Sequence, residues 1–377
     1  MKGEDILKNK NECCNTKKTS IGGQALIEGI MMRGPKVSAM AVRNPEGEIV
    51  LEKWENETVK RPKILKLPFI RGIFNFIDSM KAGYKALMRS AEISGLEEIE
   101  AEAEREKAAK KAAKKAKKAE KKGDAPAVSE AEEQTEQDIL TVSESADEKK
   151  SGTGALMNAI MVVAMILGVA LSVVLFIMLP SYIYKGLAFL FPVLQPEDAV
   201  LTSLIKSFFE SFLRIALLVG YMCLVSLMKD IRRTFQYHGA EHKTIFCYES
   251  DLELTVENVK AQRRFHPRCG TSFLILMLLV GMFISFLIDP ISIAITGAVP
   301  VTWLRTLIKL LLLPLTMGIG YELIKLAGRR DNLFTRIISA PGMWLQRLTV
   351  FDPDDDMIEC AITAFKEVIP EDNSDKY

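Results

Sequence analysis

Residues 155–178 read ALMNAIMVVAMILGVALSVVLFIM and lie inside a longer stretch, residues 151–184, that contains no charged side chain. A helix of this length crosses the roughly 30 Å hydrocarbon core of a lipid bilayer. Hydrophobic residues make up 49% of the chain, which agrees with a protein that resides in a membrane. We therefore predict an integral membrane protein whose partner is the lipid bilayer.

Three more apolar segments follow the first, and each predicts a further transmembrane helix. These spans are expected over residues 207–228, 271–289 and 306–326. The intervening residues 290–304 are apolar but interrupted by prolines and a glycine, so they predict an interfacial or re-entrant hairpin. The expected fold class is mainly α-helical, with about four transmembrane helices. They form a membrane domain over residues 151–328, whose first span is expected over residues 155–178.

The distribution of basic residues predicts the orientation in the membrane. The loop 229–270 carries eight of them: Lys229, Arg232, Arg233, Lys243, Lys260, Arg263, Arg264 and Arg268. The segments expected on the other side are poor in lysine and arginine, so this loop and both termini are predicted to be cytoplasmic. Residues 1–20 have no apolar core and predict no secretory signal. Six scattered cysteines do not predict a disulfide framework, and cytoplasmic thiols stay free to bind metal.

The soluble parts divide into three expected regions. Residues 1–18 predict a disordered tail. Residues 19–100 predict a cytosolic α+β region, in which strand-like runs flank the turn Asn44-Pro45-Glu46-Gly47. Apolar residues at helical spacing over 63–95 predict a helix, either on the membrane surface or in the core of the cytosolic region. Residues 329–377 predict a cytosolic C-terminal region, where four aspartates at 352 and 354–356 begin a helix over 355–368 rather than form a calcium loop.

Residues 101–150 predict a charged, low-complexity linker. Nine lysines lie between residues 107 and 122, and nine acidic residues follow between residues 124 and 148. A solvated spacer is the simplest interpretation. The lysine-rich segment 107–122 can also contact anionic lipids, and no nucleic-acid partner is expected.

All three histidines of the chain lie within 29 residues: His238, His242 and His266. On a helix, His238 and His242 share one face because they are four residues apart. Glu241 precedes the second of them and is a candidate general base, since H-x-x-E-H is the reversed zincin pattern. His266-Pro267-Arg268-Cys269 adds a thiolate, and imidazole with thiolate favours zinc. The candidate metal ligands are therefore His238, His242, His266 and Cys269.

The predicted topology brings other polar residues to the same end of the membrane domain. The glycine-rich segment 22–35 carries Glu28 and Arg33 in apolar surroundings. Glu28 is a second candidate base, and Arg33 or Arg268 can hold an anionic group. Glu322 lies near the cytosolic end of the fourth span. A buried carboxylate is costly unless it is paired or ligating, so these acids are expected to have partners.

Each of these residues also has a structural interpretation. Glu28 can pair with Arg33, Glu322 with Lys325, and Glu210 with Arg214, while Lys309 reaches the membrane surface. Glu241 can be a surface charge beside Lys243. The two histidines on the helix can form a hydrogen-bonded pair that packs on Tyr237 and Tyr248, and His266 with Cys269 can form the turn that leads into the third span.

Two functions remain open at this point. The first is a metal-dependent membrane enzyme, a hydrolase with zinc bound at the cytosolic membrane face. The second is a non-catalytic scaffold or assembly factor, in which the same residues form a structural metal site or a hydrogen-bonded cluster and the protein binds a membrane protein partner. A transporter is disfavoured because no inverted repeat is visible and the polar residues gather at one face.

Four stretches of the sequence resemble a known family: GGQALIEGIMMRGP (22–35), LPFIRGIFNFIDSMKAGYKAL (67–87), YHGAEHKTI with RFHPRCGTSF (237–273), and YELIKLAGR with PGMWLQRLT (321–349). In these stretches the chain is similar to the YqhQ-like family of bacterial multi-pass membrane proteins. The resemblance implies a location in the bacterial inner membrane. The family's function is unknown, and its label of predicted metal-dependent enzyme agrees with the zinc hypothesis without supplying a substrate.

Overall fold

The computed structural model describes residues 18–56, 62, 65, 67–95, 153–329, 332–372 and 374–375. The contacts divide the chain into two units, Met1–Gly95 with Met178–Tyr377, and Leu96–Ile177. The predicted linker 101–150 and all but the last residue of the predicted tail 1–18 lie outside the described residues.

A four-stranded antiparallel sheet forms near the N-terminus, with strand order β1-β2-β3-β4. Its strands are β1 (Gly22–Leu26), β2 (Gly29–Arg33), β3 (Val37–Arg43) and β4 (Ile49–Glu55). The predicted hairpin around residues 44–47 is confirmed as the β3–β4 pair. The β1–β2 pair was not predicted, because the glycines that allow it to pack closely also weaken its strand pattern.

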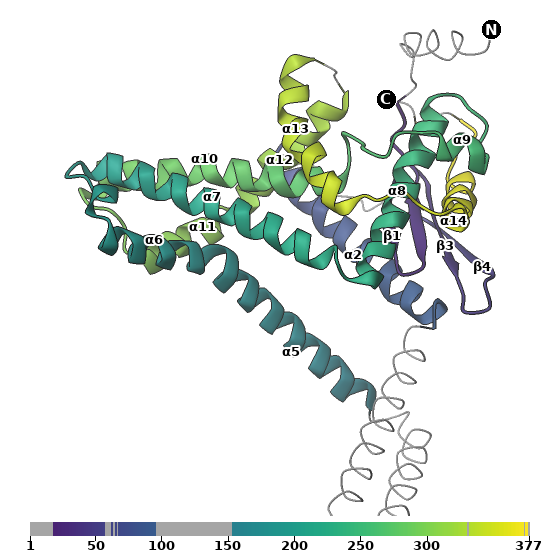
Figure 1. Cartoon of the computed structure of the whole chain (residues 1–377), viewed down its shortest axis with the longest axis horizontal. Helices are drawn as coiled ribbons and strands as arrows, with labels where there is room; N and C mark the ends of the chain where they lie inside the picture. The colour runs from purple at the N-terminus through teal and green to yellow at the C-terminus, as the bar shows by residue number, and fades with distance from the viewer. Residues whose placement is uncertain are drawn as a thin grey trace, which may run out of the picture. The chain divides into compact units, whose positions relative to one another are not determined.

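The two faces of the sheet pack against different helices (Figure 1). One face carries Ile30 and Met32 against α8 (Lys229–Glu249) and α14 (Asp355–Lys366). The other face carries Met31 and Met40 against α2 (Ile70–Ile93). Successive side chains of a strand point to opposite faces, so the alternation within β2 decides which residues meet α8. Helices α2 and α14 confirm the predicted helices over 63–95 and 355–368.

The remainder of the larger unit is helical, and several helices are long and apolar enough to cross a membrane. Three candidate spans are Val163–Leu190, Ala199–Val225 and Gly270–Thr296, with mean hydropathies of 2.7, 1.8 and 2.6. Ala199–Val225 is α7 and Gly270–Thr296 is α10, while Val163–Leu190 includes α6 (Leu179–Leu190). This span begins within α5 (Thr153–Val173) and continues through a π-helical turn (Val174–Met178) into α6. Its residues up to 177 belong to the smaller unit.

A fourth span is formed if two bent helices are taken together. Helix α11 (Thr302–Leu311) and helix α12 (Leu313–Arg329) meet at an angle of 45°. Helix α12 packs along α10 and α2, so the chain returns to the end of the bundle that carries the sheet. The predicted fourth span, 306–326, therefore falls on a bent pair of helices rather than on one straight helix.

The helix that contains the third predicted span does not end at residue 289. Helix α10 continues through Pro290 to Thr296, and Gly297 ends it with a φ of 73°. A proline inside a membrane helix is tolerated where neighbouring groups satisfy the freed backbone. The predicted hairpin over 290–304 is consequently reduced to the short connection between α10 and α11.

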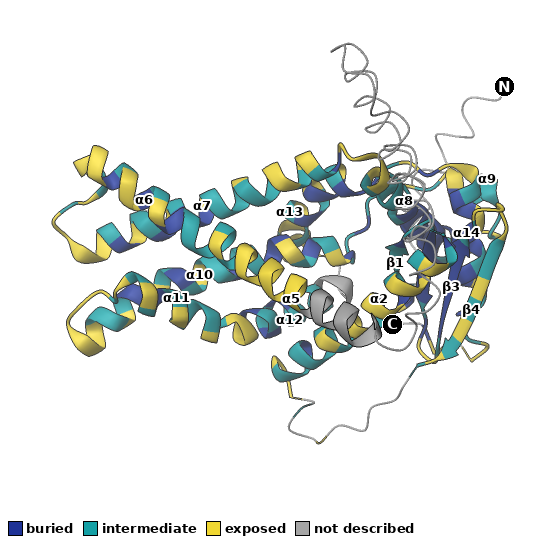
Figure 2. Ribbon diagram, turned by 90° about the horizontal axis from the view of Figure 1, so that it is seen from below, coloured by how far each residue is buried: buried dark blue, intermediate teal, exposed yellow. Residues whose placement is uncertain are grey.

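Within the larger unit, the part that contains the sheet is more buried than the part that consists of the remaining helices. Figure 2 shows buried residues concentrated between the sheet, α8 and α14, whereas the helices of the helical part carry many exposed and intermediate residues. The exposed residues of the helical part include large apolar side chains such as Phe208, Phe212 and Phe283, each 63% exposed. A lipid bilayer covers such surfaces, which agrees with several membrane-inserted helices.

Helix α13 (Leu333–Thr349) connects the helical part to the sheet part. It packs mainly on α10 and also contacts α8. Gly342 lies directly on Ser272 of α10, where an added Cβ would be only 2.4 Å from the serine Cβ. This contact brings the C-terminal end of α13 to the start of α10 and places Thr349 near His238.

Candidate metal centre

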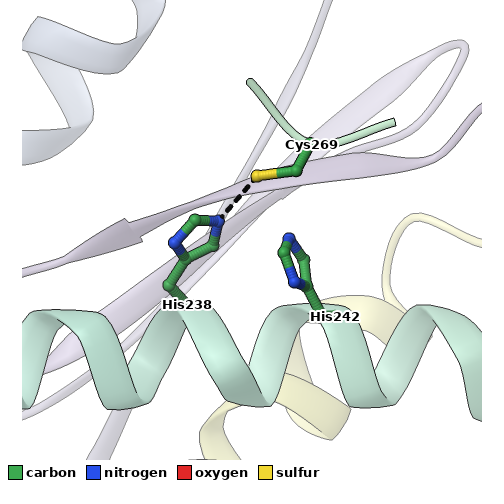
Figure 3. A group of neighbouring side chains, drawn as sticks. All are labelled: His238, His242 and Cys269. Atoms are coloured by element: carbon green, nitrogen blue, oxygen red, sulfur yellow. Dashed lines mark hydrogen bonds between the residues drawn. The ribbon is translucent and has the colours of Figure 1, made fainter. Parts of the chain in front are cut away.

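Three side chains form one group that can hold a metal ion. The ligand atoms of His238, His242 and Cys269 all lie within 4.8 Å of one another, and no other such group occurs in the described part of the chain. The two histidines lie one turn apart on α8, with ring centroids 4.5 Å apart. Figure 3 shows both rings directed toward the thiol, which comes from the residue that caps the N-terminus of α10.

Backbone carbonyls orient both imidazole rings. Nδ1 of His238 lies 3.0 Å from the carbonyl oxygen of Thr349, and Nδ1 of His242 lies 2.6 Å from that of Arg264. A carbonyl can only accept, so each Nδ1 carries the proton and each Nε2 presents its lone pair. Histidines that bind metal usually donate their other ring nitrogen in this way, which fixes the tautomer and the ring orientation.

The Nε2 atom of His242 has an unusual environment. It is fully buried and has no hydrogen-bond partner among the described residues. An imidazole nitrogen withdrawn from water without a partner costs of the order of 1–3 kcal/mol. This atom faces the group formed by His238 and Cys269, so a ligand in that group would remove the penalty.

Cys269 caps the N-terminus of α10. Its sulfur lies 3.0 Å from Nε2 of His238 and accepts from the backbone N–H of Thr271 at 3.4 Å. Two imidazoles and one cysteine sulfur form a group that can hold a metal ion, and zinc is a metal that takes this set of donor atoms.

Glu241 is buried, so the interpretation as a surface charge beside Lys243 was wrong. Its exposed fraction is 7%, and its Oε1 accepts from the backbone N–H of Gly23 at 2.8 Å. Burial raises the pKa of this carboxyl, although His238 and the N–H of Gly23 oppose the shift. A side chain at residue 23 would lie only 3.1 Å from the carboxyl carbon, so the glycine permits the approach.

A polar cavity of about 150 Å³ connects these groups. Its walls include Glu241, His242 and Cys269, together with the first strand at Gly22 and Gly23. The carboxylate of Glu241 and two of the candidate metal ligands therefore face the same small space, which is large enough for a few water molecules.

His266 lies beside this group and lines the same cavity, but its ring nitrogens have other neighbours. Its Nδ1 accepts from the backbone N–H of Arg268 at 3.3 Å, and its Nε2 lies 3.2 Å from the Arg268 guanidinium and 3.9 Å from the Glu249 carboxylate. Burial lowers the pKa of His266 to about 4, so the ring is neutral at pH 7. Both its backbone groups bond to the side chain of Gln346, at 2.8 and 2.7 Å. His266 therefore supports the group rather than completing it.

Glu28 and Arg33 are not brought to the group. The Glu28 carboxylate forms two hydrogen bonds with the guanidinium of Arg233, at 2.6 and 2.5 Å, instead of pairing with Arg33. Arg33 follows Met32 in β2, so the two side chains point to opposite faces of the sheet. Met32 points to the face that packs on α8, where Glu241 lies, and Arg33 therefore points to the face that packs on α2. Arg268 does line the cavity, and its guanidinium bonds to Glu249 and to the carbonyl oxygen of Thr19.

The remaining predicted pairs are realised in part. Glu322 is held by Arg71 of α2, at 2.7 and 2.5 Å, and the predicted partner Lys325 adds an electrostatic attraction. Glu210 does bind Arg214, at 3.3 Å. Lys309 donates to Glu210 at 2.8 Å, and its expected place at the membrane surface stays a prediction.

Sequence reasoning missed the groups that orient the ligands. Thr349 and Arg264 act through their carbonyl oxygens, and a backbone atom leaves no signal in residue type. Gln346 is different, because a fully buried glutamine must satisfy its amide and so marks a structural junction. Gly23 could have been found as the second glycine of a Gly-Gly pair beside a predicted functional segment.

Comparison with known proteins agrees with the resemblance found in the sequence. A family described as "Protein of unknown function (DUF1385)" matches residues 67–371. The chain is 32% identical over 352 residues to the uncharacterized protein YqhQ of Bacillus subtilis (strain 168), and the alignment covers 92% of each chain. No solved structure matches. With most of its length covered by both comparisons, the chain belongs to the YqhQ-like DUF1385 family of unknown function.

Proposed function

We propose that this protein is a metal-dependent membrane enzyme, with zinc held by His238, His242 and Cys269. The observation that carries the proposal is the buried, unpartnered Nε2 of His242, which faces a second imidazole nitrogen and a thiol. Carbonyl oxygens at both Nδ1 atoms leave the two Nε2 atoms free to bind a cation. Three protein ligands leave the fourth tetrahedral position for water, as in catalytic zinc sites.

The proposed reaction is a hydrolysis. Zinc, when bound, lowers the pKa of a coordinated water toward 7. Glu241 faces the cavity that His242 and Cys269 also line, so it is positioned to accept a proton there. The N–H of Gly23 holds one carboxylate oxygen at 2.8 Å and thereby fixes the direction of the other. Glu28 and Arg33 have no place in this arrangement.

The basic loop before α10 supports a cytoplasmic site. Eight lysines and arginines lie within residues 229–270, on the side of the membrane helices where the group forms. We therefore place the group at the cytoplasmic face of a bacterial inner membrane, with both termini on that side.

A second candidate function rests on the 3.0 Å contact between Nε2 of His238 and the sulfur of Cys269. A thiol at a helix N-terminus beside a histidine is an arrangement that activates cysteine nucleophiles. It accounts for His238 and Cys269 but leaves Nε2 of His242 without a partner, so the metal site explains more of the geometry.

Metal content tests the proposal. The detergent-purified protein, loaded with zinc and desalted, is expected to contain about one zinc per chain by plasma mass spectrometry. His242→Ala and Cys269→Ser should lose the metal, whereas Glu241→Gln should keep it. Cys223→Ser is the matched control, since Cys223 is exposed and lies on α7 outside the group. A metal-free protein whose Cys269 reacts rapidly with iodoacetamide would favour the cysteine nucleophile instead.

Cobalt substitution separates a catalytic site from a structural one. Azide added to the cobalt protein should change its visible absorption if one coordination position is open to exchange. An unchanged spectrum with one bound metal per chain would support a closed structural site and hence the scaffold function.

A further inference from the structure

An apolar groove lies in the helical part of the molecule and is separate from the polar cavity at the candidate metal centre. Its volume is about 270 Å³, and its wall is apolar throughout. The groove is lined by side chains of three helices, which include Ile215 and Val219 of α7, Ile275 and Leu279 of α10, and Trp344 and Leu345 of α13. It therefore offers a place for an apolar ligand between two candidate spans and α13.

The groove lies at the depth of lipid acyl chains. Val219 precedes the end of α7 by six residues, and Leu279 follows the start of α10 by nine residues. At 1.5 Å per residue, these positions are about 9 Å and about 14 Å from the helix ends. Half of the hydrocarbon core of a bilayer is about 15 Å thick. Because α7 ends and α10 begins at the end of the bundle where the candidate metal centre forms, the groove lies within the leaflet on that side.

Helices α10 and α13 connect the groove to the candidate metal centre. On α10, Cys269 precedes Ile275 by six residues, which is about 9 Å along the helix. On α13, Leu345 and Thr349 share one face because they are four residues apart. The carbonyl oxygen of Thr349 is the group that holds His238. A chain seated in the groove therefore has one end close to two of the candidate metal ligands.

One face of α13 is apolar and exposed. Leu333, Phe334, Ile337 and Trp344 are each more than half exposed, and their spacing places them on the same side of the helix. An exposed apolar face of this kind marks a surface that a membrane covers. Trp344 belongs both to this face and to the wall of the groove, so the groove is continuous with the surface that the bilayer covers.

The apolar wall selects an acyl chain over a peptide. A peptide segment in the groove would bring backbone N–H and C=O groups into a place that offers them no hydrogen bond, which is costly inside a bilayer. An acyl chain carries no such groups. The first polar bond of a lipid acyl chain is its carboxyl ester, which would lie at the end of the chain that points toward the candidate metal centre.

We propose that the substrate is a membrane lipid, whose acyl chain occupies this groove and whose acyl ester reaches the candidate metal centre. The inference rests on the proposed metal-dependent hydrolysis and names the substrate class for it. Water adds to the ester carbonyl carbon and gives a proton to Glu241. The bond between that carbon and the alcohol oxygen breaks, and the proton passes to the alcohol. The products are a fatty acid and an alcohol.

Carboxylates of different chain length test the groove and the metal centre together. The full-length cobalt protein is titrated with acetate and with octanoate, and its visible absorption is followed. Each CH₂ group removed from water strengthens binding about fourfold, so octanoate is expected to bind about a hundredfold or more tightly than acetate. Val219→Phe fills the groove and should reduce this ratio about tenfold or more, with acetate binding unchanged. Val200→Phe at the other end of α7 is the matched control.

Photolabelling of the unmodified zinc-loaded protein is a second measurement that needs no variant. A phospholipid with a diazirine in its acyl chain should label Val219 and Trp344 to saturation at low lipid concentration. Phe283 of α10, which is exposed and outside the groove, should be labelled in proportion to the lipid added. Labelling of the groove residues that rises in the same proportion would overturn the proposal, also when Val219→Phe does not fold.

The outcomes separate the lipid substrate from the metal-dependent enzyme. Equal affinities for acetate and octanoate, or a Val219→Phe variant that keeps the preference, would overturn the lipid substrate while the bound metal leaves the enzyme proposal standing. A protein that binds no metal by plasma mass spectrometry would overturn the enzyme itself, and this substrate with it.

Discussion

The protonation of two ring nitrogens decides what His238 and His242 can do. Each Nδ1 donates to a backbone carbonyl, from Thr349 and Arg264, so each Nε2 is an acceptor for a metal or a thiol. Nothing about the spacing of the histidines requires this tautomer. It follows from α13 and the segment before α10, which carry the two carbonyl oxygens to the ring edges.

Gly23 is the residue at which a small change should have the largest local effect. A Cβ at this position would be 2.7 Å from the carbonyl oxygen of Met31 and 3.1 Å from the carboxyl carbon of Glu241. We expect Gly23→Ala to lower the free energy of unfolding by about 1–3 kcal/mol, as overpacking usually does. Thermal unfolding in detergent measures this loss of stability. Gly22→Ala, where no atom lies within 4 Å of the added carbon, should stay within about 0.5 kcal/mol of the unmodified protein. Equal effects of the two substitutions would contradict the close approach of β1 to α8.

At the scale of elements, helix α13 joins the membrane helices to the candidate metal centre. Gln346 of α13 bonds to both backbone groups of His266 and to the Ser272 hydroxyl of α10. These bonds fix the segment that leads into Cys269. The position of the thiol therefore depends on how closely α13 packs against α10.

Gly342 sets that packing distance. We expect Gly342→Ala to destabilise the protein and to lower its zinc content, because the added carbon would lie 2.4 Å from Ser272. Gly281→Ala is the matched control on α10, since its added carbon would make an ordinary 3.9 Å contact with Thr316. Metal analysis and the unfolding midpoint, measured on the same preparations, check both effects. If Gly342→Ala kept full metal content, α13 would have no part in positioning Cys269.

The connection between α2 and α12 is an ion pair with two hydrogen bonds. Arg71 and Glu322 are 32% and 21% exposed, so solvent screens the pair only in part. We expect Arg71→Met and Glu322→Gln to show a coupling free energy of about 1 kcal/mol or more in a double-mutant cycle. Additive effects in unfolding experiments would show that the pair does not hold α2 on the bundle.

At the scale of the whole molecule, the arrangement of the membrane helices predicts which segments share a side. The chain after α12 packs at the same end as α8, through the contacts of α13 with α8 and of α12 with α2. With α11 and α12 as one broken span, the segments 191–198 and 297–301 lie together at the other end.

Reporter fusions test this topology. Alkaline phosphatase fused after residue 195 should be active, and the same enzyme fused after residue 250 should be inactive, because the basic loop is expected in the cytoplasm. A fluorescent protein that folds only in the cytoplasm should give the reverse pattern. Phosphatase activity at residue 250 would place the candidate metal centre outside the cytoplasm and remove the reducing environment that keeps Cys269 free.

The sequence by itself determined the features that depend on near neighbours along the chain. The uncharged run at 155–178 predicts a membrane helix because length and hydropathy are local properties. The turn at 44–47 predicts the β3–β4 hairpin for the same reason, since glycine and asparagine tolerate the backbone conformation that a tight turn needs. The spacing of His238 and His242 placed both rings on one helix face.

Only the tertiary structure decided which distant groups meet. Glu28 lies five residues from Arg33, yet it pairs with Arg233 because β2 turns Arg33 toward the opposite face of the sheet. His266 follows the predicted ligand pattern, yet its Nε2 lies against the Arg268 guanidinium and near the Glu249 carboxylate. Such pairings depend on the packing of whole elements, and the chemistry of a residue type does not specify which of several partners the fold will bring to it.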